Sequence, residues 1–177
     1  MQGCCRGFTL FELLMTIALA AIVLTLGLPS FSGTLARNRQ HVEINALFHA
    51  IHLARKESIR RRQVMSLCPS VDLQTCSGST DWSSGWILFN NADRDSPPQV
   101  DPGETVVLMH AVEESLEITA NRRAFTLRAT FRRATNGTFV FCDRAERIAP
   151  RALVVSYTGR PRVAAARPDG TPYRCAD

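Results

Sequence analysis

The sequence contains 177 residues, carries a formal net charge of +5 at pH 7, and is 45% hydrophobic. This length leaves room for one soluble domain of ordinary size beside a membrane segment, which excludes a chain of several large domains. The charge is strongly segregated. Residues 63–121 hold one arginine against nine acids, and residues 122–177 hold twelve arginines against four acids. A basic C-terminal block of this kind points to a polyanion or an acidic partner.

An apolar run near the N-terminus is the most informative stretch of the chain. In residues 8–28, Glu12 is the only ionisable residue. Twenty-one helical residues span about 30 Å, the thickness of a bilayer core, so we expect residues 8–28 to form the transmembrane half of a helix. A carboxylate in the bilayer costs about 2.5–3.5 kcal/mol and needs a cationic partner. If the chain is cut after Gly7, the new amine of Phe8 on a neighbouring subunit can supply that cation.

The residues at the start of this run resemble a known processing signal. A short basic leader followed by Gly7-Phe8-Thr9-Leu10-Phe11-Glu12 is similar to the class III signal of type IV pilins and type II secretion pseudopilins. The resemblance implies that a prepilin peptidase removes residues 1–7 and methylates Phe8, and that Glu12 aids filament assembly. An ordinary signal anchor is the alternative. A secretory signal peptide is disfavoured, because Gly7 precedes a hydrophobic region that is too long for one.

Arg6 is expected to stay in the cytoplasm by the positive-inside tendency. The chain is therefore expected to cross the inner membrane once, with its globular domain in the periplasm, before it enters a pilus or pseudopilus. Residues 29–62 continue as the amphipathic half of the same helix, since apolar residues recur at steps of three and four behind Pro29. Arg60-Arg61-Arg62 ends this half, where cations suit the helix dipole, and contact with a partner is the alternative role.

Residues 63–177 form the predicted β-rich globular domain. Short apolar runs separated by turn residues predict strands at 64–68, 85–89, 105–110, 116–119, 125–131, 138–141 and 152–157. Asn136-Gly137, between two of these runs, predicts a β-hairpin. One long helix followed by short strands indicates an α+β fold with antiparallel sheets.

The cysteines indicate an exported domain. Cys4 and Cys5 would be lost with the leader, which leaves Cys68, Cys76, Cys142 and Cys175. Four cysteines allow three pairings. We favour Cys68–Cys76, which closes a short loop, and Cys142–Cys175, which holds the C-terminus. Each bridge contributes about 2–4 kcal/mol in an oxidising compartment such as the periplasm.

No enzyme, metal or cofactor is expected. The chain has no Cys-x-x-Cys zinc spacing, and the acidic loop 91–95 lacks the ligand series of an EF-hand. His49 and His52 could share a helix face, but no carboxylate has the matching spacing. The serine-rich loop 76–84 has no histidine nearby, and no Gly-x-Ser-x-Gly motif occurs.

Later motifs resemble the GspH/FimT group of pilin-like proteins. They are Leu67-Cys68-Pro69-Ser70, Trp82–Phe89, Phe131-Arg132 with Asn136-Gly137-Thr138, and Ala152–Ser156 leading into Thr158–Arg162. The resemblance implies a pilin-like fold, in which a long N-terminal helix packs on a two-sheet globular domain. It also implies a minor type IV pilin placed in a pilus or its tip, with a minor pseudopilin of type II secretion as the alternative. The implied partners are the prepilin peptidase, other major and minor pilins or pseudopilins, and inner-membrane lipid.

The C-terminal arginines add DNA as a further expected partner. Gly159-Arg160-Pro161-Arg162 is similar to the arginine-bearing motif with which some FimT-like minor pilins bind DNA during uptake. Arg160, Arg162, Arg167 and Arg174 lie in a segment rich in proline and glycine. Clustered arginines suit sequence-independent phosphate contacts, and Tyr157 and Tyr173 could stack on bases. Alternatively, these arginines solubilise the tail or pair with the acidic middle segment of a neighbouring subunit.

Overall fold

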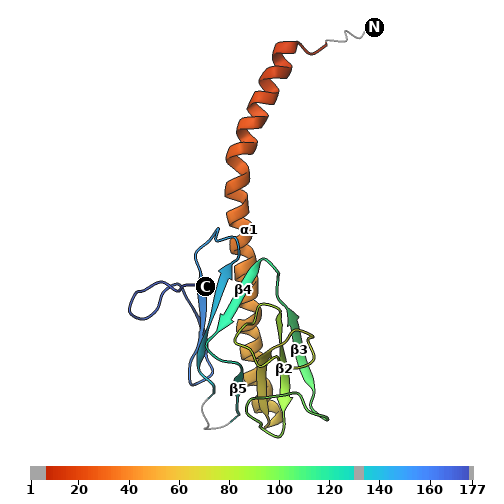
Figure 1. Ribbon diagram of the computed structural model, residues 1–177, viewed down its shortest axis with the longest axis vertical. Helices are drawn as coiled ribbons and strands as arrows, with labels where there is room; N and C mark the ends of the chain where they lie inside the picture. The colour runs from red at the N-terminus through yellow and green to blue at the C-terminus, as the bar shows by residue number, and fades with distance from the viewer. Residues whose placement is uncertain (1–6, 130–133, 176–177) are drawn as a thin grey trace. The chain divides into compact units, whose positions relative to one another are not determined.

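A computed structural model describes residues 7–129 and 134–175, without the side chains of residues 26–30. The described residues form one helix followed by eight strands (Figure 1). They are α1 (Leu10–Arg61), β1 (Val64–Pro69), β2 (Gly85–Asn91), β3 (Val106–Ala111), β4 (Leu116–Ala120), β5 (Phe125–Leu127), β6 (Gly137–Asp143), β7 (Arg151–Val155) and β8 (Pro161–Ala164). Of the expected leader, only Gly7 lies within the described residues, and Cys4, Cys5 and Arg6 lie outside them.

The chain divides into two compact units, Met1–Leu35 and Ala36–Asp177. Helix α1 passes through Pro29 without a break and contains residues 10–61 of the two expected halves, 8–28 and 29–62. The second unit contains two four-stranded antiparallel sheets. Sheet A has the order β3-β2-β1-β5, and sheet B has the order β4-β6-β7-β8. The expected α+β architecture with antiparallel sheets is confirmed.

The predicted hairpin at Asn136-Gly137 is wrong. β5 pairs with β1 in sheet A, whereas β6 pairs with β4 and β7 in sheet B. Gly137 is the first residue of β6 and lies opposite Val155. A Cβ at Gly137 would lie 2.7 Å from Asn121 Oδ1 and 2.9 Å from a ring carbon of Phe125. Close packing therefore explains this glycine, and no tight turn is needed.

Two strand predictions also need correction. The expected strand 125–131 ends at Leu127, and Phe131 lies outside the described residues. Strand β8 was missed because it begins at Pro161, a residue that argues against a strand from sequence alone. Proline is tolerated here because it is the first residue of a strand at a sheet edge.

One hydrophobic core joins α1 to both sheets. From Ala36 onwards, α1 buries one stripe at helical spacing: Ala36, Gln40, Glu43, Ile44, Leu47, Ala50, Ile51, Ala54 and Ser58. Trp82 from the loop before β2 packs edge-on against Phe139 of β6, with ring centroids 4.9 Å apart. Phe139 also stacks on Phe125 of β5 at 4.4 Å. These rings connect the two sheets through their shared core.

Polar residues within the buried stripe fix how α1 sits on the sheets. Glu43 Oε2 lies 2.8 Å from His110 Nε2 of β3, and the His110 ring stacks on Trp86. The Gln40 side-chain amide donates hydrogen bonds to the carbonyl oxygens of Phe141 (3.0 Å) and Ala149 (3.2 Å). Buried polar groups need such partners, so these contacts specify one register of the helix.

Two disulfides close loops on the second unit. Cys68 bonds to Cys76, and Cys142 bonds to Cys175. This is the pairing that the sequence favoured. The first bridge secures the loop that covers the outer face of sheet A, where Ile87 and Phe89 form a second apolar cluster. The second bridge holds the C-terminal tail to the end of β6.

The two bridges should contribute unequally to stability. The bonded cysteines are 8 residues apart in the first bridge and 33 in the second. Because a longer loop loses more entropy when it is closed in the unfolded chain, Cys142→Ala/Cys175→Ala should cost about 1 kcal/mol more than Cys68→Ala/Cys76→Ala. Urea unfolding of both double variants measures this difference. The pairs are matched, since each has one buried and one more accessible cysteine. An equal or reversed order would contradict the loop-closure explanation.

Asp143 follows Cys142 and is held by one arginine. The Arg147 side chain donates hydrogen bonds to both Asp143 carboxylate oxygens, with Nε to Oδ2 at 2.8 Å, and its backbone N–H donates to Oδ2 at 2.9 Å. These guanidinium hydrogen bonds lower the pKa of Asp143, although burial acts in the opposite direction. The ionised carboxylate therefore stabilises the fold above the unfolded pKa, and that contribution is lost as pH falls through the lowered folded pKa.

Arg147→Gln should consequently destabilise the fold at pH 7, by roughly 1–3 kcal/mol. The difference from the parent should shrink below about pH 4, where Asp143 becomes protonated in the unfolded chain and then in the folded one. Urea midpoints between pH 7 and pH 3 test this, with exposed Arg144→Gln as the control. A difference that stays constant with pH would mean that packing of Arg147 matters, and its charge does not.

Candidate functional site

The residues that the sequence assigns to processing and assembly lie at the N-terminal end of α1. Gly7 and Phe8 precede the helix, and Phe8 is 79% exposed. Thr9 caps the helix, because its Oγ1 accepts a hydrogen bond from the Glu12 backbone N–H at 3.2 Å and its carbonyl accepts one from the Leu13 N–H at 3.1 Å. Thr9-x-x-Glu12 has the spacing of a capping box, a signal that the sequence analysis overlooked. Glu12 thus lies in the first turn, where the helix dipole favours a negative charge.

The helix behind Glu12 exposes its apolar side chains. Every described side chain from residue 7 to residue 25 is exposed, and the large apolar ones are 49–79% exposed. Monomeric soluble proteins rarely expose continuous apolar surface of this extent, and such surfaces mark sites of membrane or protein contact. Within the described residues, no helix meets the combined length and hydropathy of a membrane span.

A tight turn between β7 and β8 positions the first two C-terminal arginines. The Ser156 carbonyl accepts a hydrogen bond from the Gly159 N–H at 2.9 Å, and the Arg160 carbonyl accepts one from the Ser156 N–H at 3.1 Å. Gly159 has φ 69°, and an added Cβ would lie 3.2 Å from the Arg55 guanidinium. Arg55 itself donates a hydrogen bond from α1 to the Thr158 carbonyl. The turn is therefore fastened to α1 and requires glycine for both conformation and space.

Two of the four predicted arginines converge on one groove. Arg162 of β8 and Arg167 line a groove of about 630 Å³ over sheet B, together with Tyr173. The Arg167 guanidinium lies 5.7 Å from the centre of the Tyr173 ring, a cation–π distance. Both arginines are exposed, and Tyr173 is buried. Because Tyr173 is 7% exposed, its ring does not offer the stacking surface for a base that the sequence predicted. The two exposed guanidiniums remain as groups that can contact phosphates.

The other two arginines lie elsewhere. Arg160 is exposed, and its backbone N–H donates to Ser156 Oγ at 3.2 Å. Arg174 lines a separate hollow that also contains Asp143 and Glu146, two acids that oppose anion binding there. The sequence therefore grouped four arginines that the structure distributes over different surfaces, since sequence proximity does not show which way a side chain points.

Asp169 places a negative charge close to Arg167 of the arginine groove. Asp169 lies in the tail beside Arg167, and its carboxylate Oδ1 accepts hydrogen bonds from the Thr171 hydroxyl (2.6 Å) and backbone N–H (2.9 Å). The Thr171 hydrogen bonds lower the pKa of Asp169. Asp169 therefore remains ionised and shapes the turn that presents Arg167.

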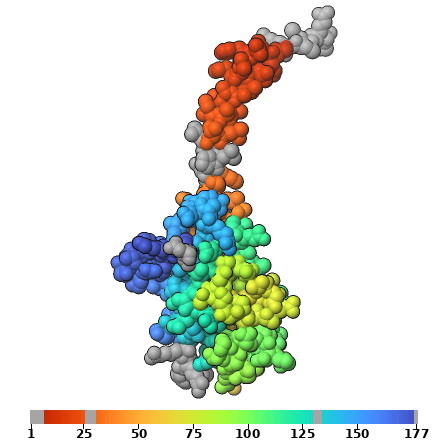
Figure 2. Space-filling model, viewed as in Figure 1, coloured from red at the N-terminus to blue at the C-terminus, as the bar shows by residue number. Residues whose placement is uncertain are grey.

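Much of the acidic middle segment lies away from the basic tail, although its last residues, 119–121, line the arginine groove. In Figure 2, residues 63–110 (yellow to green) occupy one side and the tail after residue 160 (dark blue) occupies the other. Within that segment, carboxylates of Asp93, Asp95 and Asp101 lie within 4.8 Å of one another. Asp95 accepts hydrogen bonds from the Asn91 amide and the Gln99 N–H, so this carboxylate holds the loop together.

Two models of known protein families match this sequence. The family model described as type II transport protein GspH matches residues 43–159, and the prokaryotic N-terminal methylation motif matches residues 3–28. A search of curated proteins returned no match.

Solved structures with a similar fold include the type IV minor pilin FimU of Pseudomonas aeruginosa. Its P21 crystal form has a TM-score of 0.55 at 19% identity, covering 72% of this chain and 90% of FimU. Its P65 form has a TM-score of 0.50 at 20% identity, covering 72% and 91%. The minor pseudopilin EpsH of the Vibrio cholerae type 2 secretion system has a TM-score of 0.49 at 11% identity, covering 71% and 96%.

The GspH model spans more than half of the sequence, and the methylation motif includes Gly7, Phe8 and Glu12. The chain therefore belongs to the GspH family of minor pilins and pseudopilins.

Proposed function

We propose that this chain is a minor pilin of a type IV pilus. It enters the inner membrane as a single-pass precursor with its globular domain in the periplasm. Prepilin peptidase cuts it after Gly7 and methylates Phe8, and the mature subunit is added to a pilus or its tip. The observation that carries the proposal is the exposed apolar half of α1 directly behind Gly7 and Phe8, with Glu12 in its first turn.

The chemistry of this segment suits assembly by a helix. Before assembly, lipid covers the apolar side chains, and in a filament the equivalent helices of other pilins replace that lipid. Glu12 then loses contact with water and needs a cation at the same depth. The methylated amine of Phe8 on a neighbouring subunit provides one, and a charge pair is far stronger in such a low-dielectric environment than in water.

A minor pseudopilin of type II secretion is the alternative, supported by the description of the matching family model. The same segment would act in the same way there, but the filament would serve the export of folded proteins. Deletion of the gene separates the two proposals: loss of surface pili with normal protein export supports the pilin, and the reverse result supports the pseudopilin.

Removing the charge of Glu12 should block assembly and leave processing intact. Glu12→Gln keeps a side chain that can complete the capping box, but it cannot pair with an amine. We expect the variant to be found in the membrane and to be depleted at least tenfold from sheared filaments, measured by immunoblot. Mass spectrometry should show that both parent and variant begin at methylated Phe8.

Thr9→Ala is the matched control, because it removes the cap and keeps the Glu12 charge. It should enter filaments close to the parent level. If Glu12→Gln enters as well as the parent, or if the mature protein retains residues 1–7, the assembly proposal is wrong.

We infer DNA binding as a second function. The convergence of Arg162 and Arg167 on a groove that contains Tyr173 favours it. Guanidiniums would neutralise phosphates of the DNA backbone without reading its sequence. Arg160, on the turn that leads into β8, could contact a further phosphate, whereas Arg174 lies beside acids and should contribute little.

Arg162→Gln and Arg167→Gln, each made singly, should therefore weaken DNA binding by the detergent-purified chain much more than Arg174→Gln does. Each lost phosphate contact should reduce the slope of log affinity against log salt by roughly 0.7–0.9. Fluorescence anisotropy with a labelled oligonucleotide, at several salt concentrations between about 50 and 200 mM, measures both the affinity and its salt slope. Equal effects of the three substitutions would point to net charge alone, and absence of binding at low salt would reject the function.

A further inference from the structure

A second group of arginines gathers at the C-terminal end of α1. Arg62, Arg94 and Arg128 line one hollow of about 530 Å³, together with Ile59, Gln63, Val64 and Ala129. They come from the end of the helix, the loop after β2 and the residue after β5, so only the fold brings them together. Among the described residues, no carboxylate lines the hollow.

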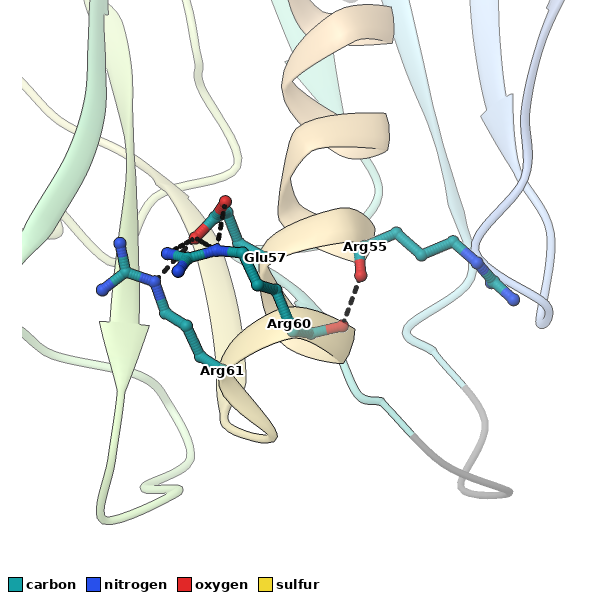
Figure 3. A network of polar contacts seen from close by, with 5 residues as sticks. Arg55, Glu57, Arg60 and Arg61 are labelled. Atoms are coloured by element: carbon teal, nitrogen blue, oxygen red, sulfur yellow. Dashed lines mark hydrogen bonds and ion pairs between the residues drawn. The ribbon is translucent and has the colours of Figure 1, made fainter.

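The arginine triplet at the helix end divides into paired and unpaired members. Glu57 Oε2 lies 2.6 Å from both Arg60 and Arg61 (Figure 3). The Arg60 hydrogen bond, followed by that of Arg61, lowers the pKa of Glu57 to about 2. Glu57 is therefore ionised at neutral pH and committed to these two arginines. Figure 3 also shows that Arg55 extends to the opposite side of the helix.

The three arginines of the hollow lack such partners. Among the residues that the structure describes, no ion pair joins Arg62, Arg94 or Arg128 to a carboxylate. The Arg128 Nε is buried and has no hydrogen-bond partner within residues 7–129 and 134–175. Asp93 and Asp95 flank Arg94 in the sequence, but neither is among the described residues that line the hollow. A buried donor without a partner is unfavourable, and three guanidiniums facing one space repel each other. A bound anion would relieve both effects.

Two of these arginines occupy positions that ordinarily favour glycine. Arg62 has φ 54° and Arg94 has φ 66°, and they are two of the four described non-glycine residues with positive φ. Arg62 stands directly after the last residue of α1, where glycine commonly ends a helix.

We propose that this hollow binds a phosphate group carried by a small molecule or a lipid headgroup. Guanidiniums bind phosphate oxygens through paired N–H donors, and three of them suit a multiply charged group better than a single carboxylate. The negative end of the helix dipole amounts to only about half a charge, which three cations outweigh. The apolar rim of Ile59, Val64 and Ala129 leaves room for the organic part of the ligand.

Isothermal titration calorimetry on the full chain in a non-ionic detergent tests the proposal. The probes are sodium phosphate, pyrophosphate and a short-chain phosphatidic acid, each compared with sodium chloride at equal ionic strength. Binding of inorganic phosphates alone identifies a free phosphate compound, and preferential binding of phosphatidic acid identifies a lipid headgroup. Either result supports the shared chemistry.

Arg94→Gln and Arg128→Gln should each weaken phosphate binding about tenfold or more, because each removes a charged hydrogen-bond donor. Arg144→Gln is the matched control, since it removes the same charge from an exposed residue outside the hollow and should change affinity less than about twofold. Arg94→Lys keeps the charge and loses the planar fork, so it should bind more weakly than the parent. If Arg128→Gln fails to fold, the exposed Arg94 variants still decide.

The absence of a phosphate-dependent heat beyond that of chloride would overturn the proposal. So would an unchanged affinity in Arg94→Gln, or an equal loss in Arg144→Gln. Tight binding of an acidic peptide or an oligonucleotide in the hollow, with none of the phosphate probes bound, would also overturn it. None of these outcomes depends on whether the chain enters a filament.

Discussion

The structure depends on the burial of one stripe of α1 in the core of the second unit. Leu47, Ile51 and Ala54 are fully buried there, and both sheets contribute side chains to the same core. Phe139 carries this contact to sheet B, while Met65 and Leu67 carry it to sheet A. Because neither sheet can bury its inner face without the helix, α1 organises the fold of the whole unit.

The exposure of α1 differs between its two ends. After Ala36 its apolar stripe is covered by the chain's own sheets, and the described side chains ahead of residue 26 have no such cover. A helix that leaves this much apolar surface exposed needs either lipid or other helices around it. The division between self-covered and exposed helix is consistent with the filament subunit proposed above, in which lipid or other helices cover the exposed part.

Acidic and basic residues are separated on the surface of the second unit. Residues 63–110 of the acidic segment lie mostly on one side of the second unit, and the tail after residue 160 lies on the other. The Cys142–Cys175 bridge holds the tail, and the pairing of β8 with β7 holds Arg162 over sheet B. A separate cluster of Arg62, Arg94 and Arg128 lies at the C-terminal end of α1. Segregated charges of this kind give each surface a distinct class of partner.

The sequence by itself determined the long helix, the α+β class and most strands, because these features follow from local periodicity and turn residues. It favoured one disulfide pairing of three, and the structure decided that Cys68 bonds to Cys76 and Cys142 to Cys175. It also determined that Gly7, Phe8 and Glu12 form one motif, since their spacing is local. Tertiary structure alone decided that Asn136-Gly137 joins two sheets, that Glu43 is buried against His110, and that Arg62, Arg94 and Arg128 meet. These results depend on contacts between residues far apart in the chain, and such contacts leave no periodic signal in the sequence.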